Sequence, residues 1–151
     1  MITTRKALIQ DLENLNTLFD AYRIFYKKKS DVEASRQFLK ERIENNESEI
    51  FVAQCSENNI EKLVGFVQLY PIFSSTRLKR FWLLNDLFVD KDFRGKGISV
   101  LLIDEAKKLA IQTDSVGLML ETDKNNIEGN HLYPKTGFEL DTEHNFYYWS
   151  E

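Results

Sequence analysis

The sequence predicts an α/β fold, a central mixed β-sheet flanked by helices, in one domain spanning residues 1–151. Strand-like alternation and helix-like spacing of apolar residues follow one another along the chain. The segment RFWLLNDLFV at residues 80–89 is apolar and β-rich enough to form a central strand. That segment leads through a glycine-rich turn directly into a helical pattern.

The N-terminal half predicts a strand, two helices and a β-hairpin. ITTRKAL at residues 2–8 alternates, and apolar residues recur at helical spacing behind Asp11. A second helix opens at Ser30–Glu33, where the residues fit a capping box. The hairpin joins FVAQC at residues 51–55 to LVGFVQLY at residues 63–70 through a polar turn.

The C-terminal half predicts two more helices and three more strands after the central one. A long helix begins at Ile98, and VGLMLET at residues 116–122 follows as a strand. Residues 126–136 predict a short helix, and GFEL with NFYYWS at residues 137–140 and 145–150 predict a closing pair of strands. The expected order is β-α-α-β-β-β-α-β-α-β-β.

Composition argues against several classes of function. A net charge of −4 disfavours bulk electrostatic binding to nucleic acid. No apolar run approaches the roughly 20 residues that span a bilayer, and the charged start lacks a signal-peptide core. We therefore expect a cytoplasmic protein without membrane association. Cys55 is the single cysteine, and His131 and His144 have no companion ligands nearby in sequence, so we expect no metal.

The segment DKDFRGKGISVLLIDEA at residues 90–106 predicts an anion site. The first backbone N–H groups of a helix lack intrahelical partners and lie at the positive end of its dipole. Gly95 and Gly97 allow close approach of the backbone to a ligand, while Arg94 and Lys96 add positive charge. The alternative is a tight turn with two exposed cations.

Two familiar phosphate-binding motifs do not fit this turn. A P-loop needs lysine directly after its last glycine, and here Ile98 follows Gly97. A dinucleotide-binding fingerprint needs a third glycine at the position of Val100.

Two segments resemble motifs of the GNAT superfamily of acetyl-CoA-dependent N-acetyltransferases. Residues 94–99 resemble [RQ]-x-x-G-x-[GA], with Ser99 in place of the last glycine or alanine. Residues 126–138 resemble N-x-x-[AG]-x-x-L-Y-x-x-x-G-F. The resemblance covers the whole chain and implies the GNAT acyl-CoA N-acyltransferase fold. Residues 22–26 and 82–89 are similar to the branch that contains polyamine, amino-acid and histone acetyltransferases.

The resemblance implies acetyl-CoA as co-substrate and a pose for it. The diphosphate would lie on the residues of the turn: Arg94, Gly95, Lys96, Gly97, Ile98 and Ser99. The pantetheine arm would bond like an added strand along Leu87, Phe88 and Val89, provided that this strand splays from its neighbour. Asn126 is implied as a helix cap, a cofactor contact, or both.

Acetyl transfer to an alkyl amine needs a base, because the reference pKa of such an amine is about 10.4. Asp86 is the candidate base or amine-binding group, and a purely structural role is the alternative. Glu121 and a water molecule are the other candidates for the base. Asn85 and Asp86 can both line the acceptor site only if the strand contains a bulge.

Tyr133 is implied by the resemblance as the acid that protonates the departing thiolate, since the family's tyrosine lies close to the thioester sulfur. Simple packing is the alternative. Pro134 disfavours helical geometry in the residue before it, so we expect Tyr133 to be aimed differently from its counterparts.

Aromatic residues predict how the acceptor binds. An aromatic wall that attracts a cationic amine is expected from Tyr22, Phe25 and Tyr26 on the first helix and Trp82 on the central strand, although aromatics at helical spacing also suit a core. We therefore predict an acyltransferase acting on a primary amine of a small molecule, such as a polyamine or an amino acid. The alternatives are acetylation of a protein lysine or N-terminus, and a non-catalytic acetyl-CoA-binding regulator. The aromatic C-terminal strand predicts a homodimer.

Overall fold

The computed structural model describes residues 1–151 as two compact units, Met1–Leu120 and Glu121–Glu151. The first unit contains a five-stranded sheet with the order β1-β2-β3-β4-β5. Its strands are β1 (Ile2–Lys6), β2 (Glu49–Glu57), β3 (Ile60–Ser74), β4 (Lys79–Val89) and β5 (Leu118–Met119). All neighbours pair antiparallel except β4 and β5, which pair parallel. The mixed α/β class predicted from the sequence is confirmed.

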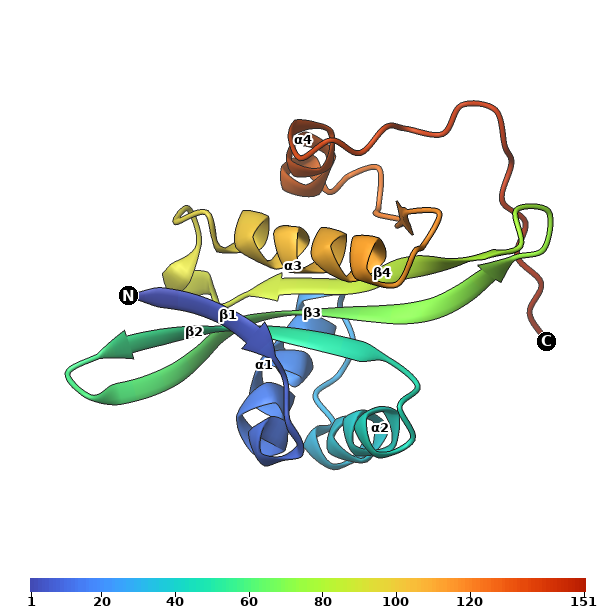
Figure 1. Ribbon diagram of the computed structural model, residues 1–151. Helices are drawn as coiled ribbons and strands as arrows, with labels where there is room; N and C mark the ends of the chain where they lie inside the picture. Colours follow the sequence, from blue (N-terminus) through green and yellow to red (C-terminus); the bar gives the residue numbers. More distant parts are fainter. The chain divides into compact units, whose positions relative to one another are not determined.

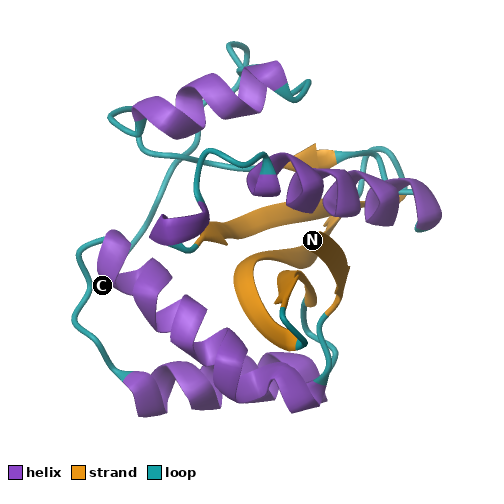
Figure 2. Cartoon of the chain, turned by 90° about the vertical axis from the view of Figure 1, so that its left-hand side faces the viewer, coloured by secondary structure: helices purple, strands orange, loops and turns teal.

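Helices cover both faces of this curled sheet. α1 (Leu12–Phe25) and α2 (Val32–Glu44) lie on one face, and α3 (Ile98–Gln112) lies on the other (Figures 1 and 2). Short 3-10 helices occupy Ile9–Asp11 and Lys91–Phe93. The second unit contains α4 (Ile127–Lys135). No helix is both long and apolar enough to cross a membrane.

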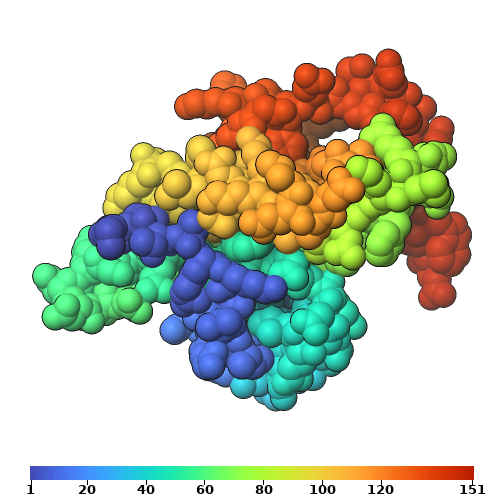
Figure 3. All heavy atoms as spheres, in the orientation of Figure 1, coloured from blue at the N-terminus to red at the C-terminus, as the bar shows by residue number.

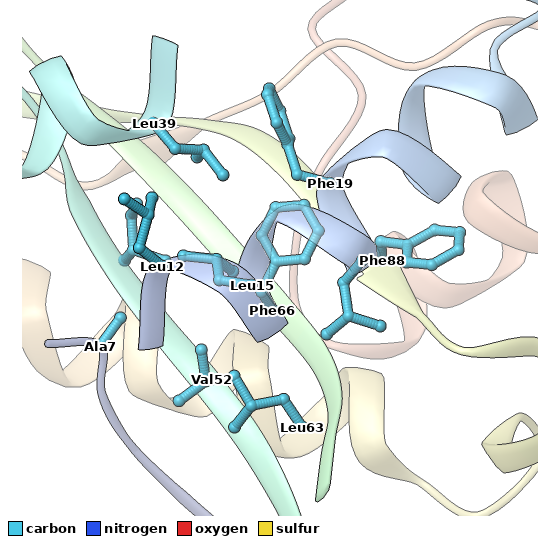
Figure 4. Packing of buried hydrophobic residues seen from close by; sticks show 11 residues of the cluster. Ala7, Leu12, Leu15, Phe19, Leu39, Val52, Leu63, Phe66 and Phe88 are labelled. Atoms are coloured by element: carbon cyan, nitrogen blue, oxygen red, sulfur yellow. The ribbon is translucent and has the colours of Figure 1, made fainter. Parts of the chain in front are cut away.

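The main core lies between α1, α2 and the sheet. Leu12, Leu15 and Phe19 of α1 recur at helical spacing and pack with Phe66 of β3 and Phe88 of β4 (Figure 4). Burying large apolar side chains of this kind stabilises the fold by about 1.5–3 kcal/mol each. The core therefore fixes α1 beside the C-terminal end of β4.

On the opposite face, α3 packs closely against β3 and β4. A Cβ atom at Gly65 of β3 would lie 2.9 Å from the carbonyl oxygen of Phe88 and 3.3 Å from Leu102 of α3. Glycine therefore permits this close approach. At the other edge of the sheet, β1 lies alongside α3 (Figure 3), where the Thr4 hydroxyl donates to Oε1 of Glu105 over 3.0 Å.

The closing pair of strands predicted at residues 137–140 and 145–150 is not formed, so that part of the predicted order is wrong. The predicted strand at residues 116–122 is reduced to β5. A strand needs a neighbouring strand with free backbone groups, and the aromatic composition of NFYYWS does not provide that neighbour. Between the two segments, Asp141 accepts backbone N–H bonds from Glu143 and His144, which forms a local turn.

Two smaller features also differ from the sequence prediction. The cap of α2 is Asp31, whose side chain accepts the Ala34 N–H over 3.0 Å. Ser30, the expected cap, donates instead to Asp20 over 2.6 Å. The segment PIFSSTRLK at residues 71–79, which the sequence predicts as a loop, instead extends the hairpin of β3 and β4, because Pro71–Ser74 pair in register with β4.

Candidate active site

The glycine turn between β4 and α3 has the geometry of an anion cradle. Gly95 and Gly97 have φ values of 75° and 76°, which lie in the left-handed region that favours glycine. Gly97 caps α3, and the first N–H bonds of the helix run from Val100 and Leu101 to its carbonyl. The N–H groups that precede Val100 in the turn have no acceptor within the helix. A Cβ atom at either glycine would meet nothing within 4 Å, so a ligand can approach the backbone closely.

The two cations of the turn lie against aromatic rings. Arg94 donates from Nε to the carbonyl of Val89 over 3.0 Å. Its guanidinium also lies 5.4 Å from the ring centre of Phe25 and 5.5 Å from that of Phe88. The Lys96 ammonium lies 4.8 Å from the ring centre of Phe93. Arg94 therefore joins α1, the end of β4 and the glycine turn.

The C-terminal end of β4 is splayed from β5, as the sequence analysis requires. The two strands pair only at Trp82 with Leu118 and at Leu83 with Met119. The remainder of β4, from residue 84 to residue 89, has β3 on one side and no parallel strand on the other. Backbone groups on that side are available to an extended ligand.

Register shows which residues present those groups. Asp90 N–H bonds to the carbonyl of Val64, and hydrogen-bonded pairs alternate along an antiparallel ladder. The backbone groups of Leu87 and Val89 therefore face away from β3, although the Val89 carbonyl already accepts Arg94. Phe88 bonds β3 through its backbone and buries its ring in the core. Phe88 is therefore a core residue, and its place among the cofactor contacts stays a prediction.

A β-bulge lies at the candidate base. Gln68 of β3 pairs with Asp86, whereas the next residue, Leu69, pairs with Leu84. Asn85 is thus the extra residue on β4. The bulge is the feature that Asn85 and Asp86 needed in order to share one side of the sheet. Asn85 is exposed and Asp86 is only 3% exposed.

The Asp86 carboxylate is buried but hydrogen-bonded. Gln68 donates from Nε2 to Oδ2 over 2.5 Å, and Asn85 donates from Nδ2 to Oδ1 over 2.8 Å. Burial raises the pKa of Asp86 above its usual value, while hydrogen bonds from Gln68, Tyr22 and Asn85 oppose that rise. A raised pKa makes the ionised carboxylate a better proton acceptor.

Three residues near this carboxylate were missed by the sequence analysis. Gln68 is fully buried on β3, and its Oε1 accepts the Ser48 hydroxyl over 2.8 Å. Tyr70, two residues along the same strand, has its pKa raised by burial and by the charge of Asp86. The available signal was a glutamine within the apolar strand LVGFVQLY, since a buried amide needs polar partners.

The aromatic wall forms only in part. Tyr22 lies beside the bulge, with its hydroxyl 3.4 Å from the Asn85 carbonyl, and its ring packs on Phe88. Phe25 also packs on Phe88 and carries Arg94 on its face. Trp82 does not join them: it is 3% exposed and donates from Nε1 to the hydroxyl of Thr113, at the end of α3. It therefore belongs to the opposite face of the sheet.

The second unit holds the remaining candidates. Asn126 caps α4 by accepting the Gly129 N–H over 3.1 Å, which confirms the capping role. Tyr133 lies within α4 and packs edge-on against Phe138. We expected Pro134 to disturb the helical geometry of Tyr133, but the helix continues through both residues to Lys135. Glu121 accepts the Tyr148 hydroxyl and is exposed, which suits a surface contact better than a buried base.

The structure shows no cluster of side chains suited to binding a metal ion. No group of three or more histidine, cysteine, aspartate or glutamate side chains converges where it could hold an ion. The side chains that do converge are the Asp86 carboxylate, the amides of Gln68 and Asn85 and the phenol of Tyr22.

Comparison with known proteins identifies the family. The model of the acetyltransferase (GNAT) family matches residues 13–138. YhfO, an uncharacterized N-acetyltransferase of Bacillus subtilis, is 42% identical over 138 residues, which cover 91% of this chain and 90% of YhfO. The crystal structure of a probable acetyltransferase is 35% identical, with a TM-score of 0.91, and covers 99% of this chain and 97% of that chain.

A more distant structure shares the fold. AAC(6')-Iy, in complex with the bisubstrate analogue CoA-S-monomethyl-acetylneamine, has a TM-score of 0.81 at 18% identity and covers 100% of this chain and 99% of that chain. With the family match and the close relatives, the cradle and the splayed strand lead to one conclusion: the chain belongs to the GNAT family and is an acetyltransferase, an enzyme of the acyltransferase class.

Proposed function

We propose that this acetyltransferase transfers the acetyl group of acetyl-CoA to a primary amine of a small molecule, such as a polyamine or an amino acid. The observation that carries the proposal is the bulge in β4, which brings a buried carboxylate, Asp86, next to Tyr22 and Tyr70. A carboxylate bordered by phenol rings suits a compact ammonium group through charge and cation–π attraction.

Acetyl-CoA would bind to the first unit through backbone groups. The diphosphate would accept N–H bonds from the turn at residues 94–99, with Ser99 adding a hydroxyl where the family has glycine or alanine. The pantetheine arm would bond the Leu87 backbone and the Val89 N–H along the open edge of β4. The GNAT family uses acetyl-CoA, and AAC(6')-Iy, which shares the fold, forms a complex with a CoA-containing analogue, which supports acetyl-CoA as the co-substrate.

The reaction then needs proton transfers at the amine nitrogen and at the departing sulfur. Asp86 would take the proton of the bound ammonium, directly or through water, and leave a neutral amine. The amine nitrogen attacks the acetyl carbonyl carbon, the carbon–sulfur bond breaks, and the thiolate departs with the bonding electron pair. The nitrogen then loses its second proton to solvent, which leaves a neutral amide, and solvent returns a proton to Tyr133 after the phenol has donated its own. Tyr133 would return a proton to that thiolate, because a phenol of pKa about 10 can protonate a thiolate whose conjugate acid has a pKa of about 8.5.

A substrate panel tests the proposed acceptor class. Release of free CoA thiol from acetyl-CoA would be measured with polyamines, amino acids and peptides that carry a lysine or a free N-terminus. The proposal predicts turnover with small amines at a higher kcat/KM than with any peptide. Turnover confined to peptides would favour protein acetylation instead, and saturable acetyl-CoA binding without turnover of any amine would favour a non-catalytic regulator.

The chain is further proposed to act as a homodimer formed through its C-terminal segment. Leu140, Tyr147 and Trp149 are 87%, 89% and 86% exposed, which leaves apolar side chains uncovered in one short segment. A second copy can cover them, because aromatic residues favour strand pairing between chains. Light scattering at micromolar concentration is expected to give twice the chain mass, and to give a lower mass for Tyr147→Ser/Trp149→Ser. A monomer mass for the wild type contradicts the proposal.

A further inference from the structure

A line of three polar side chains runs from the beginning of β2 to the candidate base. Ser48, which directly precedes β2, donates from Oγ to Oε1 of Gln68 over 2.8 Å. Gln68 donates from Nε2 to Oδ2 of Asp86 over 2.5 Å. Gln68 is fully buried, and Asp86 is 3% exposed. Bulk water therefore does not replace these bonds at the amide.

The amide of Gln68 can take only one orientation in this line. An ionised carboxylate only accepts hydrogen bonds, so the group that faces Asp86 must be the NH₂ end of the amide. The Gln68 oxygen then faces Ser48, and the hydroxyl satisfies it by donating. The reversed amide would place its oxygen against Oδ2 of the carboxylate and lose both bonds.

Register makes this contact possible. Gln68 and Asp86 stand directly opposite each other on β3 and β4, where side chains on the same face are within reach. The bulge at Asn85 begins at this pair and adds a second donor from the other side. Asp86 is therefore held at both oxygens by neutral amides.

No cation pairs with this carboxylate. The ionisable groups around it are the phenols of Tyr22 on α1 and Tyr70 on β3, together with Arg42 on α2, which acts on Tyr70. Arg42 forms ion pairs with Glu41 and Glu47. The ionised form of Asp86 therefore depends on hydrogen bonds from neutral donors.

We propose that Gln68 and Ser48 are positioning residues for the acetyl-transfer reaction: Ser48 orients the Gln68 amide, and Gln68 aims the Asp86 carboxylate by donating to its Oδ2 atom. The inference rests on the proposed role of Asp86 as the base. It gives a role in catalysis to two residues outside the sequence motifs. Gln68 lies on β3 and Ser48 precedes β2, whereas the candidate base lies on β4.

The test compares three variants with the wild type. Gln68→Met keeps the size of the side chain and removes the donor, and Ser48→Ala removes the hydroxyl that orients the amide. Gln54→Met is the matched control, because Gln54 is also a buried glutamine in the sheet but bonds Arg5 instead. The titration midpoint of the Asp86 carboxyl carbon is followed by NMR, the pH profile of kcat/KM by kinetics, and folding by circular dichroism.

Loss of a hydrogen bond to a charged group is expected to raise the Asp86 midpoint in Gln68→Met by about one pH unit. Ser48→Ala should shift it in the same direction by less, and Ser48→Thr should restore it. Gln54→Met should leave it in place. An unchanged midpoint in folded Gln68→Met would overturn the inference. If the NMR midpoint rises while the acid limb of kcat/KM does not, Gln68 orients the carboxylate, but the proposed role of Asp86 as the base fails and with it the role of Gln68 and Ser48 in the reaction.

Discussion

Asp86→Asn is expected to lower kcat/KM by about 10²–10⁴-fold, the usual contribution of a general base. Asn cannot accept the proton of the acceptor ammonium, yet it retains the size of the side chain and one oxygen for Gln68 or Asn85. Steady-state kinetics with the best small amine measures the effect. Asp20→Asn is the matched control, because Asp20 is a buried carboxylate that bonds Ser30 on the helix side of the fold. A loss below tenfold in Asp86→Asn would contradict the assignment.

The pH dependence of the wild type follows from the same carboxylate. Because the pKa of Asp86 is raised above 3.8 by burial, kcat/KM should rise with pH through that raised value as the base ionises. The folded state binds the proton more tightly than the unfolded state. The stabilisation from the protonated group is therefore complete below the unfolded pKa and is lost as pH rises through the folded pKa. Asp86→Asn should lack both the acid limb and this decline in unfolding free energy.

Tyr133→Phe is expected to lower kcat by about 10²-fold or more, the lower range for loss of a general acid. Phenylalanine keeps the edge-on packing with Phe138, so α4 should remain folded. KM for the amine should change little, because the phenol acts on the leaving thiolate. Tyr147→Phe, an exposed tyrosine in the same unit, serves as the control. An undiminished rate in Tyr133→Phe would remove the tyrosine from the mechanism.

The glycine cradle and the central strand were predictable because both are local. Two glycines beside a helical pattern dictate the left-handed corner at Gly95 and Gly97, and the apolar segment at residues 80–89 dictates burial. Splaying of β4 from β5 followed from the family resemblance and is present in the structure. The glycine turn and the burial of the central strand depend on the chain near them, whereas the splay depends on a strand that is remote in sequence.

Trp82 shows why the acceptor side was harder to predict. Without a bulge, Trp82 and Asp86 would share a face of β4, since they are four residues apart. The extra residue at Asn85 inverts the alternation for every position before it, so Trp82 turns towards α3 and Thr113. The sequence predicts that Asn85 and Asp86 need a bulge. We did not infer from it that the same bulge would turn Trp82 to the opposite face of the sheet.

Gln68, Tyr70 and the C-terminal segment depend on partners that are remote in sequence. Gln68 meets Asp86 only because β3 and β4 pair in one register, and no local pattern states that register. NFYYWS has a strand-like pattern but forms no strand, because pairing requires a neighbour and not a propensity alone. Both cases are decided by tertiary contacts.

Calorimetric titration of the purified protein with CoA tests the central claim most directly, namely that the backbone at residues 94–99 grips the diphosphate. The account predicts saturable binding to the wild type and at least about tenfold weaker binding to Gly95→Ala/Gly97→Ala, because alanine is strained at φ near +75°. Pantetheine, which lacks the diphosphate, should bind both proteins equally. Absence of saturable CoA binding to the wild type, or equal affinity in a folded double variant, would contradict the account.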